Sequence, residues 1–218
     1  MERVDTQARS GGSGGASRGP RGKRVSFMCA ARAAKRIMIV IAASSVCLAS
    51  AWAAVPRPVR AARLYAGLAR TQWVSFGHGS KIVYEVFDPN CPYCHLLFDE
   101  LRPLIGPYKL TVRAVPVGYL SSTSMAKAAT ILMAKHPRRM MLRGEAHYSV
   151  HHGMAVPLTI PGKRVRGMLR HNLRLVSVAV GYETVPILAY RTLDGEKQFV
   201  VGRLGTRKLK RLIATMQR

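Results

Sequence analysis

The sequence contains few cysteines and few acidic residues for its length of 218 residues. Only four cysteines occur, and two of them, Cys29 and Cys47, precede residue 54, so the rest of the chain holds Cys91 and Cys94 alone. One pair of neighbouring cysteines is not a disulfide framework of the kind that supports a small secreted fold. Because 48% of the residues are apolar, the chain can bury a sizeable core in one domain without such a framework.

The shortage of acidic residues makes the chain strongly basic. It has 10 acidic residues against 35 lysines and arginines, a formal net charge of +25. Such a charge favours attraction to acidic substrates, anionic membrane surfaces or nucleic acid, although it is also typical of soluble basic proteins encoded by GC-rich genomes. The basic residues are spread along the chain without an RNP, zinc-finger or other nucleic-acid motif, so we expect no nucleic-acid partner.

The first 53 residues are predicted to be a targeting region. Residues 1–27 are rich in Gly, Ser and Arg, which is typical of a disordered extension or of an over-called start codon. Residues 28–53 have the order of a signal peptide: a basic segment, an uncharged run of 16 residues (37–52), and small residues that predict cleavage after Ala53. The run up to Val55 is also just long enough for an uncleaved membrane anchor. Either alternative places the folded part outside the cytoplasm, in the periplasm, where disulfides persist.

Residues 82–95 carry the most informative pattern of the chain. The β-branched and aromatic run Ile82–Phe87 predicts a buried strand, and the Asp-Pro-Asn sequence of residues 88–90 predicts a turn. Cys91 then opens a segment with the apolar spacing of a helix. Two cysteines two residues apart, at the junction of a strand and a helix, form a thioredoxin-like redox arrangement.

The predicted helix start gives the two cysteines different roles. Pro92 is accepted in a first helical turn, where its missing N–H would have had no partner. The Cys91 sulfur then lies at the positive end of the helix, which stabilises a thiolate and predicts that the more exposed Cys91 attacks and Cys94 resolves. Half of a zinc site and a purely structural disulfide are the alternatives. The zinc alternative is disfavoured, because no second pair of Cys or His at ligand spacing follows.

The remaining pattern predicts a strand–helix–strand unit, a helical region, and a final hairpin followed by a helix. We expect a linker over 54–80, in which residues 56–72 could form a short helix and Trp73–Phe76 the end of a strand, and a folded domain over 81–218. Within that domain the predicted elements are a strand at Leu110–Val117, a helical insertion over about 121–179, a hairpin turning at Asp194-Gly195, and an amphipathic helix at 205–217.

The predicted insertion has three segments. One helix runs through Met125 to Met133 and ends at His136-Pro137, residues 137–165 are irregular, and a second helix spans Gly167–Val180. His147, His151 and His152 lie in the irregular segment. They offer an i, i+4 pair for a metal, but no third ligand is evident, so exposed loop histidines are the favoured interpretation.

From about Trp73 to Met216 the chain resembles the periplasmic thiol:disulfide interchange proteins of the DsbC/DsbG type. The Cys91-Pro92-Tyr93-Cys94 motif, preceded by Asp-Pro-Asn, is similar to that of the DsbG branch. The resemblance implies an α/β thioredoxin fold with a helical insertion between the second strand and the strand that begins with a cis-proline. It also implies that no cofactor is needed besides a redox-active Cys91–Cys94 disulfide. Cysteine-containing exported proteins would be the substrates, and a membrane protein the redox partner.

The resemblance assigns further site residues. Pro186 would be the cis-proline opposite the cysteines, where Thr184 and Val185 help to bind a substrate chain; a trans-proline at the start of a strand is the alternative. His95 and Tyr93 would tune the thiolate, His95 less than the helix end and the Pro-Tyr pair. The family's activity extends to the attack of the first cysteine on a sulfenic acid as well as on a disulfide.

Three features depart from the DsbC/DsbG pattern. Val185 replaces the threonine that those enzymes carry before the cis-proline, as it does in DsbA oxidases. Glu85 stands six residues before Cys91, where thioredoxin and DsbA carry a buried acid. We expect it to be buried with a raised pKa and to relay a proton to or from Cys94, with an exposed strand carboxylate as the alternative. The 27 residues from Ala54 to Ser80 are also too few for the family's N-terminal dimerisation domain, so we expect a monomer.

The sequence thus predicts an exported thiol:disulfide oxidoreductase of the isomerase or reductase type. A DsbA-like oxidase is the alternative within the class. From another class, a non-catalytic chaperone or assembly factor for a secretion or conjugation apparatus would use the apolar surroundings of the cysteines to hold chains.

Overall fold

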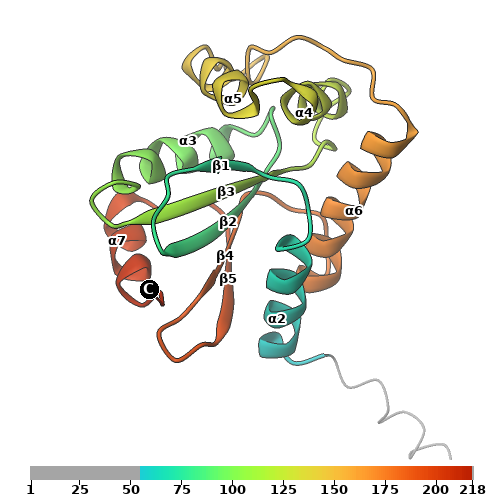
Figure 1. Cartoon of the computed structure of the whole chain (residues 1–218). Coiled ribbons are helices and arrows are strands. Elements are labelled where there is room, and N and C mark those ends of the chain that lie inside the picture. The colour runs from blue at the N-terminus through green and yellow to red at the C-terminus, as the bar shows by residue number, and fades with distance from the viewer. Residues whose placement is uncertain (1–54, 218) are drawn as a thin grey trace, which may run out of the picture. The chain divides into compact units, whose positions relative to one another are not determined.

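The computed structural model describes residues 55–217. The predicted extension, the signal peptide or anchor with its cleavage after Ala53, and the cysteines at 29 and 47 lie outside the described residues. Figure 1 shows the elements in order. They are α2 (Arg57–Leu68), β1 (Val74–Phe76), β2 (Lys81–Phe87), α3 (Pro92–Leu101), the 3-10 helix η1 (Arg102–Leu104), β3 (Leu110–Pro116), α4 (Ser124–Met133), α5 (Pro137–Ala146), α6 (Lys163–Val180), β4 (Ile187–Arg191), β5 (Lys197–Val201) and α7 (Thr206–Ala214).

The five strands form one mixed sheet in the order β1-β3-β2-β4-β5. β2 and β3 are parallel and are joined through α3, whereas the other neighbours are antiparallel. The last five residues of β2 are buried, as expected for the apolar run of a strand covered on both faces. The predicted hairpin is confirmed, because β4 and β5 pair across a turn in which Gly195 has a φ of +87°.

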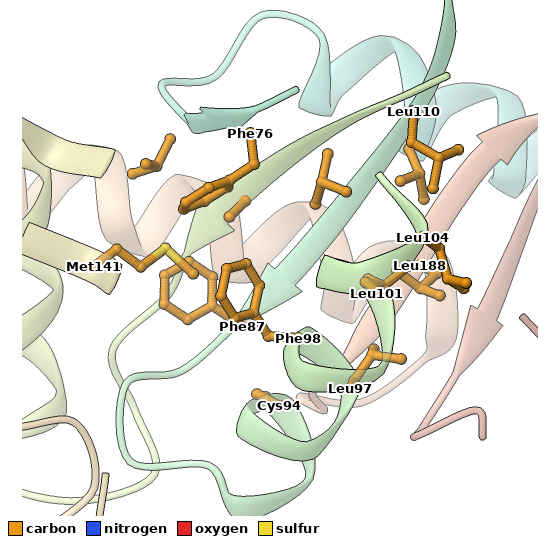
Figure 2. Packing of buried hydrophobic residues seen from close by; sticks show 14 of the residues in the cluster. Phe76, Phe87, Cys94, Leu97, Phe98, Leu101, Leu104, Leu110, Met141 and Leu188 are labelled. Carbon is orange, nitrogen blue, oxygen red and sulfur yellow. The ribbon is translucent and has the colours of Figure 1, made fainter. Parts of the chain in front are cut away.

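Helices cover both faces of the sheet, and each face has its own hydrophobic core. Helices α3 and α7 pack with the inner strands in a core that includes both cysteines. Figure 2 shows part of this core, where Phe87 and Phe98 lie beside Met141 from α5. On the other face α2 and α6 pack in a second core around Leu64 and Val176. One compact unit spans residues 54–218, and it holds every described strand and both cores.

Two stretches differ from the predicted organisation. Residues 54–80 contain the expected short helix, α2, and the expected strand end, β1, but they belong to the domain rather than to a linker, because Ala61, Leu64 and Leu68 bury one face of α2 and β1 pairs with β3. The stretch 137–165 begins with a regular helix, α5. Its Pro137 stands at the first helical position, where proline starts a helix as readily as it ends one.

The neighbouring boundaries shift accordingly. Helix α4 ends at Met133, before the predicted stop at His136-Pro137, and α6 begins at Lys163, four residues before its predicted start. Within residues 55–217, no helix combines the length and the apolarity that crossing a bilayer requires.

Candidate active site

The two cysteines lie at the junction of β2 and α3. After β2 ends at Phe87, the turn at residues 88–90 closes with a hydrogen bond of 3.0 Å from the Cys91 N–H to the Asp88 carbonyl. Cys91 is the N-cap of α3, and its Sγ accepts a hydrogen bond of 3.1 Å from the Cys94 backbone N–H. Pro92 occupies the first helical turn, as predicted. The helix start therefore directs a backbone donor at the first sulfur.

The two thiols differ in acidity more than in exposure. Cys91 is 3% exposed and Cys94 is 1% exposed, and both are free thiols. The Cys94 thiol donates to the Cys91 sulfur and, with the backbone N–H groups of Cys94 and Tyr93, lowers the pKa of Cys91 against the cost of burial. Burial, together with the neighbouring Cys91, raises the pKa of Cys94 well above its usual range. Cys91 is thus the more acidic of the two thiols, although it is only slightly more exposed than Cys94.

Asp88 holds the turn in place from inside the protein. This side chain is 1% exposed, and its Oδ1 accepts hydrogen bonds from the Asn90 N–H at 2.9 Å and from the Ser124 hydroxyl at 2.7 Å. Its Oδ2 accepts from the backbone N–H groups of Tyr119 and Leu120 at 2.8 and 3.1 Å. The carboxylate therefore joins the cysteine-bearing turn to the loop after β3 and to the start of α4.

Asn90 fastens the same turn to the helical insertion. Its amide nitrogen donates to the Ser121 and Ser124 hydroxyls at 2.7 and 2.8 Å, and its amide oxygen accepts from the Lys127 ammonium at 2.8 Å. Gly153 packs so closely on this residue that an added Cβ would lie 2.1 Å from the Asn90 Oδ1. The insertion thus fixes the backbone from which Cys91 projects.

Glu85 is buried beneath the cysteines, so the burial expected from the sequence is confirmed. Its side chain is 0% exposed, and neither carboxylate oxygen has a hydrogen-bond partner among the described residues. Burial raises the pKa of Glu85 well above its usual range, and the negative charges of Glu145 and of the Cys91 thiolate raise it further. A carboxyl group in this position holds a proton at a pH where most carboxyl groups have lost theirs.

A second buried acid, Glu145 of α5, contacts the residue that follows the cysteine pair. Its Oε2 lies 2.5 Å from the His95 Nδ1, and the His95 Nε2 lies 3.6 Å from Asp99. The His95 ring is stacked on Tyr148, with the ring centres 4.2 Å apart. Burial raises the pKa of Glu145, whereas the hydrogen bond from His95 lowers it. His95 therefore connects α3, the helix that begins at the cysteine pair, to α5.

Sequence reasoning missed Glu145, Tyr148, Asn90, Asp88 and Lys127 as parts of the site. Glu145 belongs to the stretch predicted to be irregular, and its contact with His95 joins residues 50 positions apart. For Lys127, one signal was present in the sequence, because a lone lysine on an otherwise small and apolar helix face has to find partners when it is buried.

The residues assigned to substrate binding precede β4. The peptide bond between Val185 and Pro186 is cis, as the resemblance implies. Pro186 is buried, Thr184 and Val185 are half-buried, and Val185 packs against the core that contains both cysteines. Tyr93, between the cysteines, is 62% exposed and available for contact with a partner.

Three of the histidines of the insertion were considered as metal ligands. His147, His151 and His152 are exposed, and they line a hollow of about 750 Å³ that also includes Asn90. No group of three metal-ligating side chains occurs within residues 55–217.

Comparison with known proteins finds similarity to thiol:disulfide interchange proteins. No family model matches the chain. The chain is 28% identical over 143 residues to the thiol:disulfide interchange protein DsbG of Pseudomonas aeruginosa, covering 63% of this chain and 54% of that protein. It is 30% identical over 124 residues to DsbG of Escherichia coli, covering 56% of this chain and 48% of that protein. The chain thus spans about half the length of the curated relatives it matches and is similar to DsbG proteins.

Solved structures confirm the predicted fold class. A periplasmic thioredoxin-like protein from Salmonella enterica serovar Typhimurium superposes with a TM-score of 0.56 at 18% identity, over 69% of this chain and 94% of that chain. The catalytic domain of Proteus mirabilis ScsC gives a TM-score of 0.57 at 17% identity, over 72% and 96% of the two chains. The fold is therefore thioredoxin-like, with α4, α5 and α6 inserted between β3 and β4.

Proposed function

We propose that the protein is an exported thiol:disulfide oxidoreductase of the DsbC/DsbG type, acting as an isomerase or reductase on disulfides of extracytoplasmic proteins. The observation that carries the proposal is the asymmetry of the cysteine pair. Cys91 accepts hydrogen bonds at a helix start that lower its pKa, while the pKa of Cys94 behind it is raised. A reactive first thiolate and a protonated second thiol are what a two-step exchange requires.

The exchange proceeds through a mixed disulfide. The Cys91 thiolate attacks one sulfur of a substrate disulfide, forms the Cys91–substrate bond and expels the other substrate sulfur as a thiolate. Cys94 then loses its proton and attacks the Cys91 sulfur, which releases the second substrate thiol and leaves the Cys91–Cys94 disulfide. The substrate gains two electrons and the enzyme loses two. In isomerisation, the released substrate thiolate attacks a second disulfide of the substrate, and the thiolate freed there attacks the mixed disulfide and expels the Cys91 thiolate, so the enzyme stays reduced.

In the molecules in which its carboxyl group is ionised, Glu85 is proposed to accept the Cys94 proton during resolution. Its carboxyl group is buried with a raised pKa and has no hydrogen-bond partner among the described residues, so its carboxylate is a stronger base than an exposed one. Thr184, Val185 and Pro186 are proposed to bind the backbone of the substrate beside Cys91. Tyr93, which is largely exposed, would contact the same chain.

A DsbA-like oxidase is the second candidate, and two observations favour it. Glu85 is buried where oxidases carry an acid, and Val185 rather than threonine precedes the cis-proline. In this direction the Cys91–Cys94 disulfide would be donated to a substrate dithiol, with each step reversed.

The reduction potential of the pair separates the two candidates. Equilibration of the chain from Ala54 onward with glutathione buffers measures it, with tryptophan fluorescence or alkylation as the readout. A potential near roughly −120 mV, that of a strong oxidant, would support the oxidase, and a distinctly more reducing value supports the isomerase or reductase. A pair that did not cycle with glutathione would overturn both and leave the alternative of a chaperone that holds chains.

Two cysteine variants test the mechanism directly. Cys91→Ser abolishes reduction of a model disulfide such as insulin, because the attacking sulfur is lost. Cys94→Ser retains the first attack and accumulates a mixed disulfide, which non-reducing electrophoresis detects. A Cys91→Ser variant with full biological activity would instead support the chaperone.

The setting of the enzyme is part of the proposal. We propose that it acts in the periplasm, that a membrane protein keeps the pair reduced, and that it works as a monomer. The arrangement of residues 57–76 supports the monomer, because they are used in α2 and β1 of this same domain. Light scattering measures the oligomeric state.

A further inference from the structure

Helices α2 and α6 form a basic face without acidic residues. They lie side by side in Figure 1 and share the second hydrophobic core, and the Arg60 guanidinium of α2 donates a hydrogen bond of 2.9 Å to the Ala179 carbonyl of α6. None of the eight acidic residues between positions 55 and 217 lies in either helix. The exposed basic residues of this face are Arg57, Arg63, Lys163, Arg164, Arg166, Arg170 and Arg174.

Most of these cations are available to an external anion, since among them only Arg57 and Arg166 donate hydrogen bonds within residues 55–217, to the Phe199 and Pro161 carbonyls at 3.1 and 3.2 Å. Within the described part of the chain, every ion pair involves His95 or Arg203, so no basic residue of α2 or α6 is paired with a carboxylate. Apolar side chains interrupt the basic face: Val55 is 40% exposed, Val59 is 41% exposed and Val178 is 65% exposed. Water hydrates the arginines but not the exposed valines between them, so this surface would gain from contact with a partner that has both anionic and apolar groups.

A small apolar hollow lies between the two helices. It has a volume of about 160 Å³, and apolar side chains of both helices line it, among them Leu64, Leu175 and Val178. Arg60, Arg63, Arg174 and His171 stand at the same hollow. An apolar depression with guanidinium groups around it matches a ligand that is both anionic and apolar.

The position of this face in the chain points to a lipid surface. Val55, which lines the hollow, directly follows the segment that contains the uncharged run 37–52. Figure 1 shows α2 beginning at the lower end of the domain, whereas α4 and α5, whose residues contact Asp88 and His95, lie at the upper end. A surface bound at α2 and α6 therefore leaves the cysteines accessible to soluble substrates.

We propose that the α2/α6 face docks on the surface of a bilayer that contains anionic phospholipids. The arginines contact lipid phosphates, and Val55, Val59 and Val178 enter the interfacial layer. Charge complementarity and interspersed apolar residues are the two contributions that hold a peripheral protein on such a surface. The inference does not rest on the proposed function, because docking needs neither cysteine.

The C-terminal helix α7 provides a matched control within the chain. It also carries four exposed basic residues, Arg207, Lys208, Lys210 and Arg211, but its large apolar side chains point inward, with Leu209 and Ile213 buried. If net charge alone governed binding, removing three charges from either face would weaken binding equally. If the combination of charge and exposed valines matters, only the α2/α6 face is needed.

The test is co-sedimentation of the chain from Ala54 onward with vesicles in 100 mM NaCl. That chain includes the compact unit with both hydrophobic cores. Vesicles of phosphatidylcholine are compared with vesicles that contain about one third phosphatidylglycerol. The first variant combines Arg63→Gln, Arg170→Gln and Arg174→Gln, and the control combines Lys208→Gln, Lys210→Gln and Arg211→Gln.

We expect binding to the anionic vesicles only, and a partition coefficient roughly 100-fold lower in the first variant, since each basic residue near an anionic surface contributes about fivefold. The control variant changes binding less than threefold. A Val59→Ser, Val178→Ser double variant weakens the binding that persists at 500 mM NaCl. Unchanged melting temperatures and redox activity show that these exposed substitutions leave the fold intact.

Three results would overturn the proposal. Equal losses in the two triple variants would mean that only net charge matters. An affinity for duplex DNA equal to that for the anionic vesicles, with the same dependence on the α2/α6 arginines, would identify a surface that binds polyanions in general. Release of the protein from the vesicles by millimolar inorganic phosphate would identify a site for a free anion rather than for a bilayer.

Discussion

Replacing Glu85 with leucine should stabilise the protein while impairing its chemistry. The side chain is 0% exposed in the middle of β2, and both oxygens lack hydrogen-bond partners among the described residues. An unsatisfied buried polar group costs about 1–3 kcal/mol, and leucine has a similar volume without that cost. We therefore expect Glu85→Leu to raise the free energy of unfolding at pH 8 by about 1–3 kcal/mol.

The gain in the free energy of unfolding should depend on pH, because burial raises the pKa of Glu85 in the folded protein. As the pH rises above the ordinary glutamate pKa, the unfolded chain releases this proton while the folded chain retains it. The wild-type protein then loses stability until the raised pKa is reached. A leucine has no proton to hold, so its advantage is smallest near pH 4 and grows as the pH rises.

Urea denaturation of the reduced proteins at several pH values between 4 and 9 measures this gain. Glu196→Gln, at an exposed hairpin position, is the control and should stay within about 0.5 kcal/mol of the wild type. Resolution of a mixed disulfide should be slower in Glu85→Leu, measured by rapid-quench alkylation. A stability gap that did not change with pH, or a destabilised variant at pH 8, would refute the reasoning and indicate that the carboxylate is paired.

Three further predictions concern the insertion and its attachment to the redox helix. Gly153→Ala should cost about 1–3 kcal/mol of unfolding free energy, because Gly153 has a φ of +65° and an added Cβ would collide with Asn90. Gly162→Ala is the control and should change stability little, because the space around Gly162 is open. A double-mutant cycle of Glu145→Gln and His95→Ala should give a coupling energy of about 0.5–3 kcal/mol, and additive effects would show that the 2.5 Å contact contributes nothing. Met141→Ala should cost about 2–5 kcal/mol in urea denaturation, because this fully buried side chain fixes α5 to the core, and a smaller cost would mean that α5 is only loosely attached.

The sequence was sufficient for the elements whose pattern is local. The apolar run of β2, the proline after Cys91 and the Asp-Gly turn each have one strongly preferred structure, and all three occur as predicted. Burial of Glu85 also followed from local pattern, because its neighbours in the strand are apolar. The cis bond before Pro186 followed from the family resemblance, and nothing in the sequence around it would have indicated it alone.

The parts that were missed depend on contacts between distant residues. Pro137 was interpreted as the end of one helix when it is the start of the next, and both roles suit a proline. Glu145 is hidden from sequence reasoning because its burial requires α5 to pack on the sheet. Three of the four hydrogen-bond donors to the Asp88 carboxylate are 31 to 36 residues away along the chain, so its role in joining the turn to the insertion emerges only after folding.

Acidic residues are scarce in this chain, and several of them lie near the cysteines. Of the eight acidic side chains in the described residues, Glu85, Asp88 and Glu145 are buried around the cysteine pair, between 0% and 3% exposed. Nearby negative charges oppose a thiolate, so the hydrogen bonds at the start of α3 have to outweigh them for the pKa of Cys91 to be lowered. When Glu85 holds its proton this opposition weakens, and when Glu85 releases it the thiolate becomes less favourable. The protonation of Glu85 and the charge of Cys91 are therefore coupled, and the reduction potential of the pair should depend on pH more steeply near the raised pKa of Glu85 than a pair without a buried acid would allow.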